Sequence, residues 1–299
     1  MNHAEVAEFH QIVKRTLTIH DDRGSLAVPF RYNRFGLEQR GSLGDRRASI
    51  IDNNVLIRMI DQHVEEIITR NRRSTLERVR RAALRSGRAA DSVRVVAVVK
   101  FAPAEHVRIL AGLGTSDFGE NRPQNLLAKV ESLADLEVSW HMIGHLQSNK
   151  IKMIFSHVKM IHAVDSIKLL DALNAFAERF PAIDPPRVCL QVNTSAESSK
   201  HGPSPEEFLA SADAIAAPRR IPIVGLMTMA PLIAEGEAAR PYFAKLREIR
   251  EVLATRTGLS LPELSMGMSG DFEAAIEEGA TLVRIGSAFF EGIEPAQET

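Results

Sequence analysis

Cysteine is almost absent from the sequence, because Cys189 is the single one among 299 residues. One cysteine excludes an internal disulfide framework and a cysteine zinc cluster, and it is typical of a reducing compartment. Since Cys189 lies in the apolar run 188–192, we expect its thiol to be packed in the core.

Long hydrophobic runs are also lacking, since no apolar stretch approaches the ~20 residues that a membrane span requires. The N-terminus has no secretory apolar segment, and its acidic residues Glu5, Glu8, Asp21 and Asp22 are atypical of an organellar transit peptide. Because the net charge is only −1, no overall electrostatic attraction to nucleic acid or membranes is expected. We therefore expect a cytoplasmic protein that binds neither nucleic acid nor membrane.

Regular periodicity is missing from residues 1–54. Glycines, a proline and many arginines interrupt residues 20–47, and the apolar residues are scattered. Phe30, Tyr32 and Phe35 are the clustered aromatics. We interpret residues 1–54 as an irregular N-terminal arm, with a lid over a site or a clamp on a second subunit as the functional alternative.

From about residue 52 the pattern becomes helical. Two leading helices are predicted, one from residue 52 and one over residues 74–85 that stops at Gly87. Apolar residues recur at spacings of three to four in the first of them, at Leu56, Ile60, Val64 and Ile67.

Short apolar segments then alternate with amphipathic ones as far as about residue 291, which predicts parallel βαβ units. Eight such units favour a (β/α)8 TIM barrel, so that residues 55–299 form the barrel domain with its leading helices. The predicted strands are 93–99, 115–118, 138–143, 158–164, 188–193, 221–227, 263–266 and 282–285.

A doubly wound open sheet is the competing architecture, and it requires a glycine-rich turn after the first strand. That turn reads Lys100-Phe101-Ala102-Pro103, and no phosphate-binding G-x-x-x-x-G-K-[ST] loop is present. The barrel is therefore preferred.

Lys100 ends the first predicted strand and is the leading catalytic candidate. Active sites of such barrels lie at the carboxyl ends of the strands. A lysine with a buried stem and a partly desolvated amine has a lowered pKa and can form a Schiff base. The alternative is a lysine that only extends its amine into solvent.

The loops after the last two strands, Gly267-Met268-Ser269-Gly270 and Gly286-Ser287, lie where these barrels often hold a phosphate. Their backbone N–H groups and the helix starts that follow favour an anion, although plain turns and helix caps would use the same residues. A phosphate site opposite a Schiff-base lysine points to pyridoxal 5′-phosphate (PLP).

Arg284 lies two residues before Gly286, and a buried arginine needs a partner, for which a pyridine nitrogen is a candidate. Because arginine keeps its proton, that nitrogen would stay unprotonated and the ring would be a weaker electron sink. This argues against transamination and favours racemase-like chemistry or no chemistry at all.

Two histidines four residues apart, His141 and His145, raise the question of a metal. The first is expected in a strand and the second in a loop, and no third ligand is evident. No metal is therefore expected.

Five ordered motifs resemble those of the pyridoxal phosphate homeostasis proteins, which are single-domain relatives of the alanine racemase N-terminal barrel. The motifs are VVAVVKFAP, FGENRPQN, WHMIGHLQSNK, LSMGMSGDFEAAIEEGA and VRIGSAFFEG. The resemblance runs from about Leu56 to the C-terminus. It implies a barrel with PLP on Lys100, and it implies that the residues around the cofactor are Asn121, Met268, Ser269, Arg284, Gly286 and Ser287.

The sequence departs from the family pattern beside the implied cofactor. Val99 replaces the usual serine before the lysine and Phe101 follows it, while the Ser-Asp-Asp motif reads Ser269-Gly270-Asp271. The first 55 or so residues have no counterpart. An added arm beside an altered pocket is what a recruited enzyme would show.

Two functions follow from these patterns. The favoured one is a PLP-binding protein in PLP and amino-acid homeostasis that is not a classical enzyme. The alternative is a PLP-dependent amino-acid racemase or epimerase, for which Tyr32 of the arm is a candidate second acid–base, since Tyr242 is expected on a remote helix. PLP is the expected ligand, small amino acids are candidates, and the chain is expected to be a monomer or a homodimer.

Overall fold

The computed structural model describes the short segments 19–21, 24–26, 30–33 and 36–39, and then residues 53–293 except 196, 198–200 and 232; side chains are described from residue 61 on. The chain divides into two compact units, Met1–Asn53 and Asn54–Thr299.

The first unit contains two antiparallel strand pairs among its described residues. Strand β1 (Ile19–Asp21) pairs with β2 (Gly24–Leu26), and β3 (Phe30–Asn33) pairs with β4 (Gly36–Gln39). The sequence patterns did not indicate these four strands, because strands of three or four residues are too short to show a period. Phe30 and Tyr32 lie on β3, whereas Phe35 and most of the arm lie outside the described residues.

The second unit opens with one long helix, α2 (Asn53–Arg85), and not with the two helices expected. No glycine or proline interrupts these 33 residues, so nothing breaks the backbone hydrogen bonding between them. The predicted stop at Gly87 is confirmed: its φ of 74° is left-handed, and the Arg88 N–H donates back to the Ala83 carbonyl.

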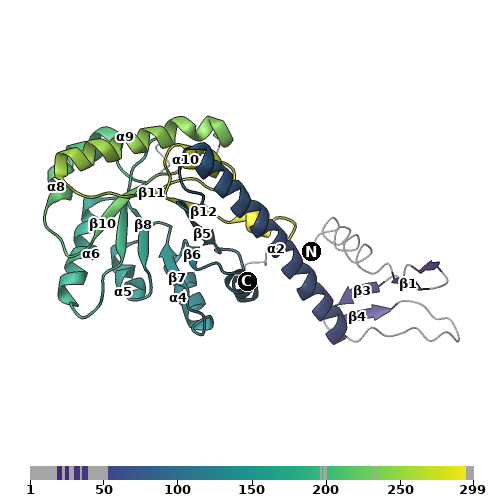
Figure 1. The fold of residues 1–299 in the computed structure, drawn as a ribbon. Helices are drawn as coiled ribbons and strands as arrows, with labels where there is room; N and C mark the ends of the chain where they lie inside the picture. Colours follow the sequence, from purple (N-terminus) through teal and green to yellow (C-terminus); the bar gives the residue numbers. More distant parts are fainter. Residues whose placement is uncertain are drawn as a thin grey trace. The chain divides into compact units, whose positions relative to one another are not determined.

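Eight parallel strands then close into the predicted barrel (Figure 1), with β12 hydrogen-bonded to β5 and β9 to β10. The (β/α)8 fold is thus confirmed. The strands are β5 (Arg94–Val98), β6 (Asp117–Glu120), β7 (Ser139–Met142), β8 (Met160–Val164), β9 (Arg187–Gln191), β10 (Ile223–Met227), β11 (Glu263–Ser265) and β12 (Leu282–Ile285).

Helices connect the strands. Among them α7 begins with the predicted capping box, in which Ser204 and Glu207 each satisfy the other's backbone N–H. None of the described helices combines the length and apolar character that a bilayer crossing requires. The helices are α3 (Ala104–Gly112), α4 (Pro123–Ser132), η1 (Ser148–Lys150), α5 (Ile151–Ile154), α6 (Ile167–Arg179), α7 (Pro205–Ala210), α8 (Ala212–Ala216), η2 (Gly236–Ala239), α9 (Arg240–Thr257), α10 (Phe272–Glu277) and α11 (Ser287–Phe290).

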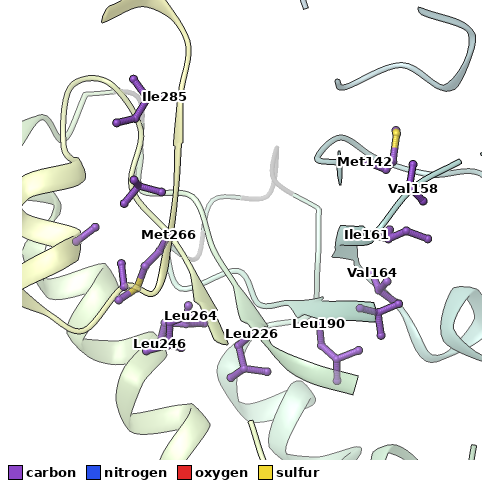
Figure 2. Packing of buried hydrophobic residues seen from close by; sticks show 14 of the residues in the cluster. Met142, Val158, Ile161, Val164, Leu190, Leu226, Leu246, Leu264, Met266 and Ile285 are labelled. Carbon is purple, nitrogen blue, oxygen red and sulfur yellow. The ribbon is translucent and has the colours of Figure 1, made fainter. Parts of the chain in front are cut away.

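The main hydrophobic core fills the layer between the strands and the helices. Figure 2 shows part of this layer, where Leu226 and Leu264 of the barrel lie beside Leu246 of α9. A smaller apolar cluster includes Val96, Cys189 and Leu282. The predicted packing of Cys189 is confirmed, and burial raises the pKa of its thiol to about 12.

Strand β12 shows how the alternation of side chains divides the two layers. Val283 and Ile285 join the strand–helix layer, so Leu282 and Arg284 point to the other face, into the barrel. Arg284 is nevertheless only 4% exposed. The closed fold therefore places a buried guanidinium inside the barrel.

Candidate functional site

A cavity of about 1040 Å³ opens at the carboxyl ends of the barrel strands. Residues in or just after all eight strands line it, which is the face where barrel active sites lie. All seven predicted site residues are among them: Lys100, Asn121, Met268, Ser269, Arg284, Gly286 and Ser287.

Lys100 lies in a turn and not at a strand end, because β5 stops at Val98. The residue is exposed, and its Nζ lies 4.8 Å from the ring centroid of Phe101, which is 56% exposed. Lys100 therefore lines the cavity as an exposed residue and not as the lysine with a buried stem that was considered above.

Ser269 joins the two loops that follow β11 and β12. Its Oγ accepts hydrogen bonds from the backbone N–H groups of Gly286 and Ala288, at 3.3 Å each. The two N–H groups therefore converge on one point beside the cavity. Such a pair of donors is a fitting cradle for an anionic oxygen.

Gly286 brings this cradle close to β5, the strand that precedes Lys100. A Cβ at position 286 would lie 3.2 Å from both the Cβ and the carbonyl oxygen of Val98. On the neighbouring loop, Asp271 is buried, and its Oδ1 accepts from the Met268 N–H at 2.5 Å. Burial raises the pKa of this carboxyl, while the bond from Met268 opposes the shift.

An ion pair joins the half-buried Lys129 to the fully buried Glu120, which directly precedes Asn121. Lys129 Nζ on α4 lies 2.6 Å from Glu120 Oε2 and donates to the Val99 carbonyl at 2.8 Å. The second carboxylate oxygen of Glu120 accepts from the Asn121 N–H at 2.8 Å. One pair therefore fixes the backbone just before Lys100 and at Asn121, a role that the sequence patterns did not indicate.

Asn121 is also held by a close approach of the next loop. A Cβ at Gly144 would lie 2.3 Å from the Asn121 carbonyl oxygen, so only glycine fits there.

Arg284 is anchored inside the barrel through both of its Nη atoms. Nη1 donates to Ser265 Oγ at 2.6 Å and Nη2 donates to the Thr228 carbonyl at 3.0 Å. Nε makes no hydrogen bond within the described part of the chain. Among the described side chains, the only fully buried polar atom without a partner belongs to Arg94. Arg284 Nε also lacks a partner, so it is not fully buried, and it is accessible from the cavity that Arg284 lines. Burial lowers the pKa of Arg284 to about 10, against the attraction of Asp271, and the guanidinium stays charged at neutral pH.

Three further buried side chains continue from Ser265 across the barrel interior. His162 Nδ1 lies 2.7 Å from Ser265 Oγ, and His162 Nε2 lies 2.9 Å from His141 Nδ1. His141 Nε2 then lies 2.9 Å from Asp117 Oδ1. We call the series Asp117–His141–His162–Ser265–Arg284 the relay. Its members come from β6, β7, β8, β11 and β12.

The relay separates a cation and an anion by neutral groups. Burial lowers the pKa of His162 well below its ordinary value, and burial also lowers that of His141, where Asp117 opposes the shift. Burial acts to raise the pKa of Asp117, but hydrogen bonds from His141 and Ser116 lower it to about 2. Arg284 and Asp117 are thus the charged ends.

The other polar residues considered for the site differ in whether they line the cavity. His145 lines the cavity, but His141 does not, because it is enclosed in the relay. Tyr242 packs against the hydrophobic core on α9 and is not part of the described cavity lining.

Comparisons with known proteins agree with this geometry. A family profile described as the alanine racemase N-terminal domain matches residues 74–294. The pyridoxal phosphate homeostasis protein of Pseudomonas aeruginosa is 45% identical over 224 residues, which are 75% of this chain and 94% of that protein. The chain belongs to the pyridoxal phosphate homeostasis protein family.

Two kinds of solved barrel structure are similar to this member of the pyridoxal phosphate homeostasis protein family, and they differ in sequence identity. PipY of Synechococcus elongatus PCC7942, solved with PLP bound, is 36% identical with a TM-score of 0.63, over 71% of this chain and 98% of PipY. An alanine racemase of Clostridium difficile 630 is 14% identical with a TM-score of 0.54, over 69% of this chain and 53% of the racemase. The racemase therefore shares the fold alone.

Proposed function

We propose that this chain binds PLP as a Schiff base on Lys100 and serves in PLP and amino-acid homeostasis. The observation that carries the proposal is that Lys100 and the Ser269–Gly286 cradle line one cavity. The family membership and the PLP-bound relative support it.

The residues present fit the cofactor at each of its polar ends. The backbone N–H groups of Gly286 and Ala288, which donate to Ser269 Oγ here, would be donors to a phosphate, and Ser269 and Ser287 line the same cavity. Lys100 offers a primary amine to the aldehyde. Asn121 and Met268 complete the proposed set.

Arg284 would direct its unpaired Nε–H toward the pyridine nitrogen. Because Arg284 is charged and held by two other bonds, it can donate a hydrogen bond but does not release a proton. PLP, when bound, supplies an electron-withdrawing ring, and an unprotonated ring nitrogen makes that withdrawal weaker. This supports a carrier over a transaminase.

The alternative is an amino-acid racemase or epimerase, which needs a second acid–base besides Lys100. No tyrosine is among the cavity residues that the structure describes, and Tyr242 is remote from them. The family membership and the PLP-bound relative favour the carrier. We further propose small amino acids as secondary ligands, a monomer or homodimer as the assembly, and the cytoplasm as the location.

Borohydride reduction followed by peptide mapping tests the attachment point. The reduced adduct should map to Lys100, and Lys100→Ala should abolish it, whereas the control Lys152→Ala, an exposed lysine of α5, should not. An adduct on Lys150 or Lys200 would contradict the assignment.

An amino-acid panel tests carrier against enzyme. A carrier should show no exchange of the α-proton with solvent deuterium for any amino acid. Exchange that depends on Lys100 would establish the racemase-type function instead.

A further inference from the structure

A second polar cluster lies at the rim of the cavity and has no part in the proposed cofactor site. It consists of His145, Asp165 and His201. His145 follows β7, Asp165 follows β8 directly, and His201 lies in the loop after β9. The carboxyl ends of these neighbouring strands meet at one edge of the barrel, so residues far apart in sequence come together there.

The positions of these side chains are fixed by their surroundings. The His201 carbonyl accepts from Gln191 Nε2 at 2.8 Å, which ties the loop to β9. Asp165 Oδ1 accepts from Ser166 Oγ at 3.4 Å, which orients the carboxylate. The rings of His145 and His201 stack with centroids 4.4 Å apart and 13° between their planes.

The distances suit a small cation. Asp165 Oδ2 lies 2.7 Å from His145 Nδ1 and 3.8 Å from His201 Nδ1, and one ligand atom from each residue lies within 4.8 Å of the others. Ligands at about 2.0–2.1 Å from a tetrahedral zinc ion are about 3.3 Å apart. One of the two distances from Asp165 Oδ2 is shorter and the other longer than that value.

The 2.7 Å contact between His145 Nδ1 and Asp165 Oδ2 is a hydrogen bond, and a metal ion would replace the proton between these two atoms. The Asp165 carboxylate is 10% exposed, and within the described residues no lysine or arginine pairs with it. Imidazole nitrogens are the commonest metal ligands in proteins. The side chains of His145 and His201 are 43% and 60% exposed, so an ion can enter from solvent.

From these observations we propose that His145, Asp165 and His201 bind a divalent transition-metal ion of the zinc class at the rim of the cavity. Two imidazoles and one carboxylate, with no thiolate, suit Zn²⁺, Ni²⁺, Cu²⁺ or Fe²⁺ better than Mg²⁺ or Ca²⁺. Three protein ligands leave at least one coordination position for water or for an anionic ligand of the cavity.

Calorimetric titration of the metal-stripped, PLP-free full chain with Zn²⁺ tests the proposal. We expect one high-affinity ion per chain, and at least a tenfold loss of affinity in His145→Ala, His201→Ala and Asp165→Asn. The matched controls His157→Ala and His63→Ala remove exposed histidines elsewhere and should keep wild-type affinity. Affinities of both ligand-histidine variants equal to those of the controls would overturn the site.

Co²⁺ provides a second readout that does not depend on stoichiometry. Bound at this site, it should give the intense visible bands of four- or five-coordinate cobalt, and His201→Ala should lose them. Because the two histidines are exposed, their variants should keep the wild-type circular dichroism spectrum. A weak six-coordinate spectrum shared by wild type and variants would also overturn the proposal.

Discussion

His162 Nε2 and His141 Nδ1 lie 2.9 Å apart, so one hydrogen atom stands between the two rings. His141 Nε2 faces the Asp117 carboxylate and must donate to it, which leaves its Nδ1 as an acceptor. His162 therefore donates from Nε2 and accepts at Nδ1 from the Ser265 hydroxyl. Since Ser265 also accepts from Arg284, every bond of the relay runs in one direction, from the cation to the anion.

Stability should depend on pH through the two relay histidines. Burial lowers the pKa of both, so the unfolded chain binds their protons more readily. The stabilisation is complete above the ordinary histidine pKa of about 6.5 and is lost as the pH falls below it. We expect the free energy of unfolding to fall by up to about 1.4 kcal/mol per pH unit for each histidine.

Urea unfolding of the PLP-free protein between about pH 7.5 and pH 5.5 measures this slope. His162→Gln should flatten it, whereas the exposed control His157→Ala should leave it unchanged. If the free energy of unfolding falls with pH as steeply in His162→Gln as in the wild type, other groups cause the loss of stability at acid pH. Below about pH 4 a further loss should follow, because the unfolded chain then protonates Asp117 at its ordinary pKa while the folded protein holds that pKa at about 2.

Ser265→Ala should destabilise the barrel and disturb the cofactor together. The change leaves Arg284 Nη1 buried without its acceptor, which costs about 1.5–3 kcal/mol for a bond to a charged group. The PLP absorbance band should shift as Arg284 moves. The control Ser132→Ala removes an exposed hydroxyl at the end of α4 and should change neither quantity. Lost stability with an unchanged band would separate Ser265 from the cofactor.

Lys129→Met should cost about 3–5 kcal/mol of unfolding free energy, because it leaves the fully buried Glu120 carboxylate unpaired. PLP affinity should fall as well, since Lys129 and Glu120 fix the backbone beside Lys100 and Asn121. Lys152→Met on α5 is the exposed control. Wild-type stability in Lys129→Met would show that water or a shifted Glu120 replaces the pair.

Ser269→Ala and Ser287→Ala test the proposed phosphate cradle. A hydroxyl that bonds a charged phosphate contributes about 1.5–3 kcal/mol, so its loss should weaken PLP binding roughly ten- to a hundredfold. Spectroscopic titration with PLP measures the change. If both variants bind as tightly as wild type, the phosphate is held by backbone groups alone or lies elsewhere.

Deletion of residues 1–50 should give a barrel that folds and binds PLP. The unit Asn54–Thr299 contains the closed barrel and all seven candidate residues, and its described core is built from its own side chains. Thermal unfolding and PLP titration of the truncated chain check this. Insoluble or cofactor-free protein would mean that the arm belongs to the fold. Retained PLP with loss of an amino-acid-dependent spectral change would instead identify the arm as a lid.

The sequence patterns correctly predicted elements that depend mainly on residues close together in the chain. The last strand was predicted at residues 282–285 and is β12, and the capping box at Ser204 forms as expected. The leading helices were divided in error near residue 74, where polar residues interrupt the apolar period but no helix breaker is present.

The relay was not predicted, because its members lie on five strands spread from Asp117 to Arg284. A signal exists in the strands: His141, His162, Ser265 and Arg284 each stand between two apolar residues. Read with the two-residue period of a strand, that pattern places a polar side chain inside the barrel. Which of them meet depends on the register of the closed sheet, and no single segment contains that information.

The closure of the barrel also determines how this chain can associate. A closed sheet has no free edge, so its strands cannot be extended by those of another molecule. Within the described residues, open edges occur only in the pairs β1–β2 and β3–β4 of the first unit. Among the described strands, edge-to-edge association of intact copies would therefore involve β1–β4, and removing these strands should suppress it.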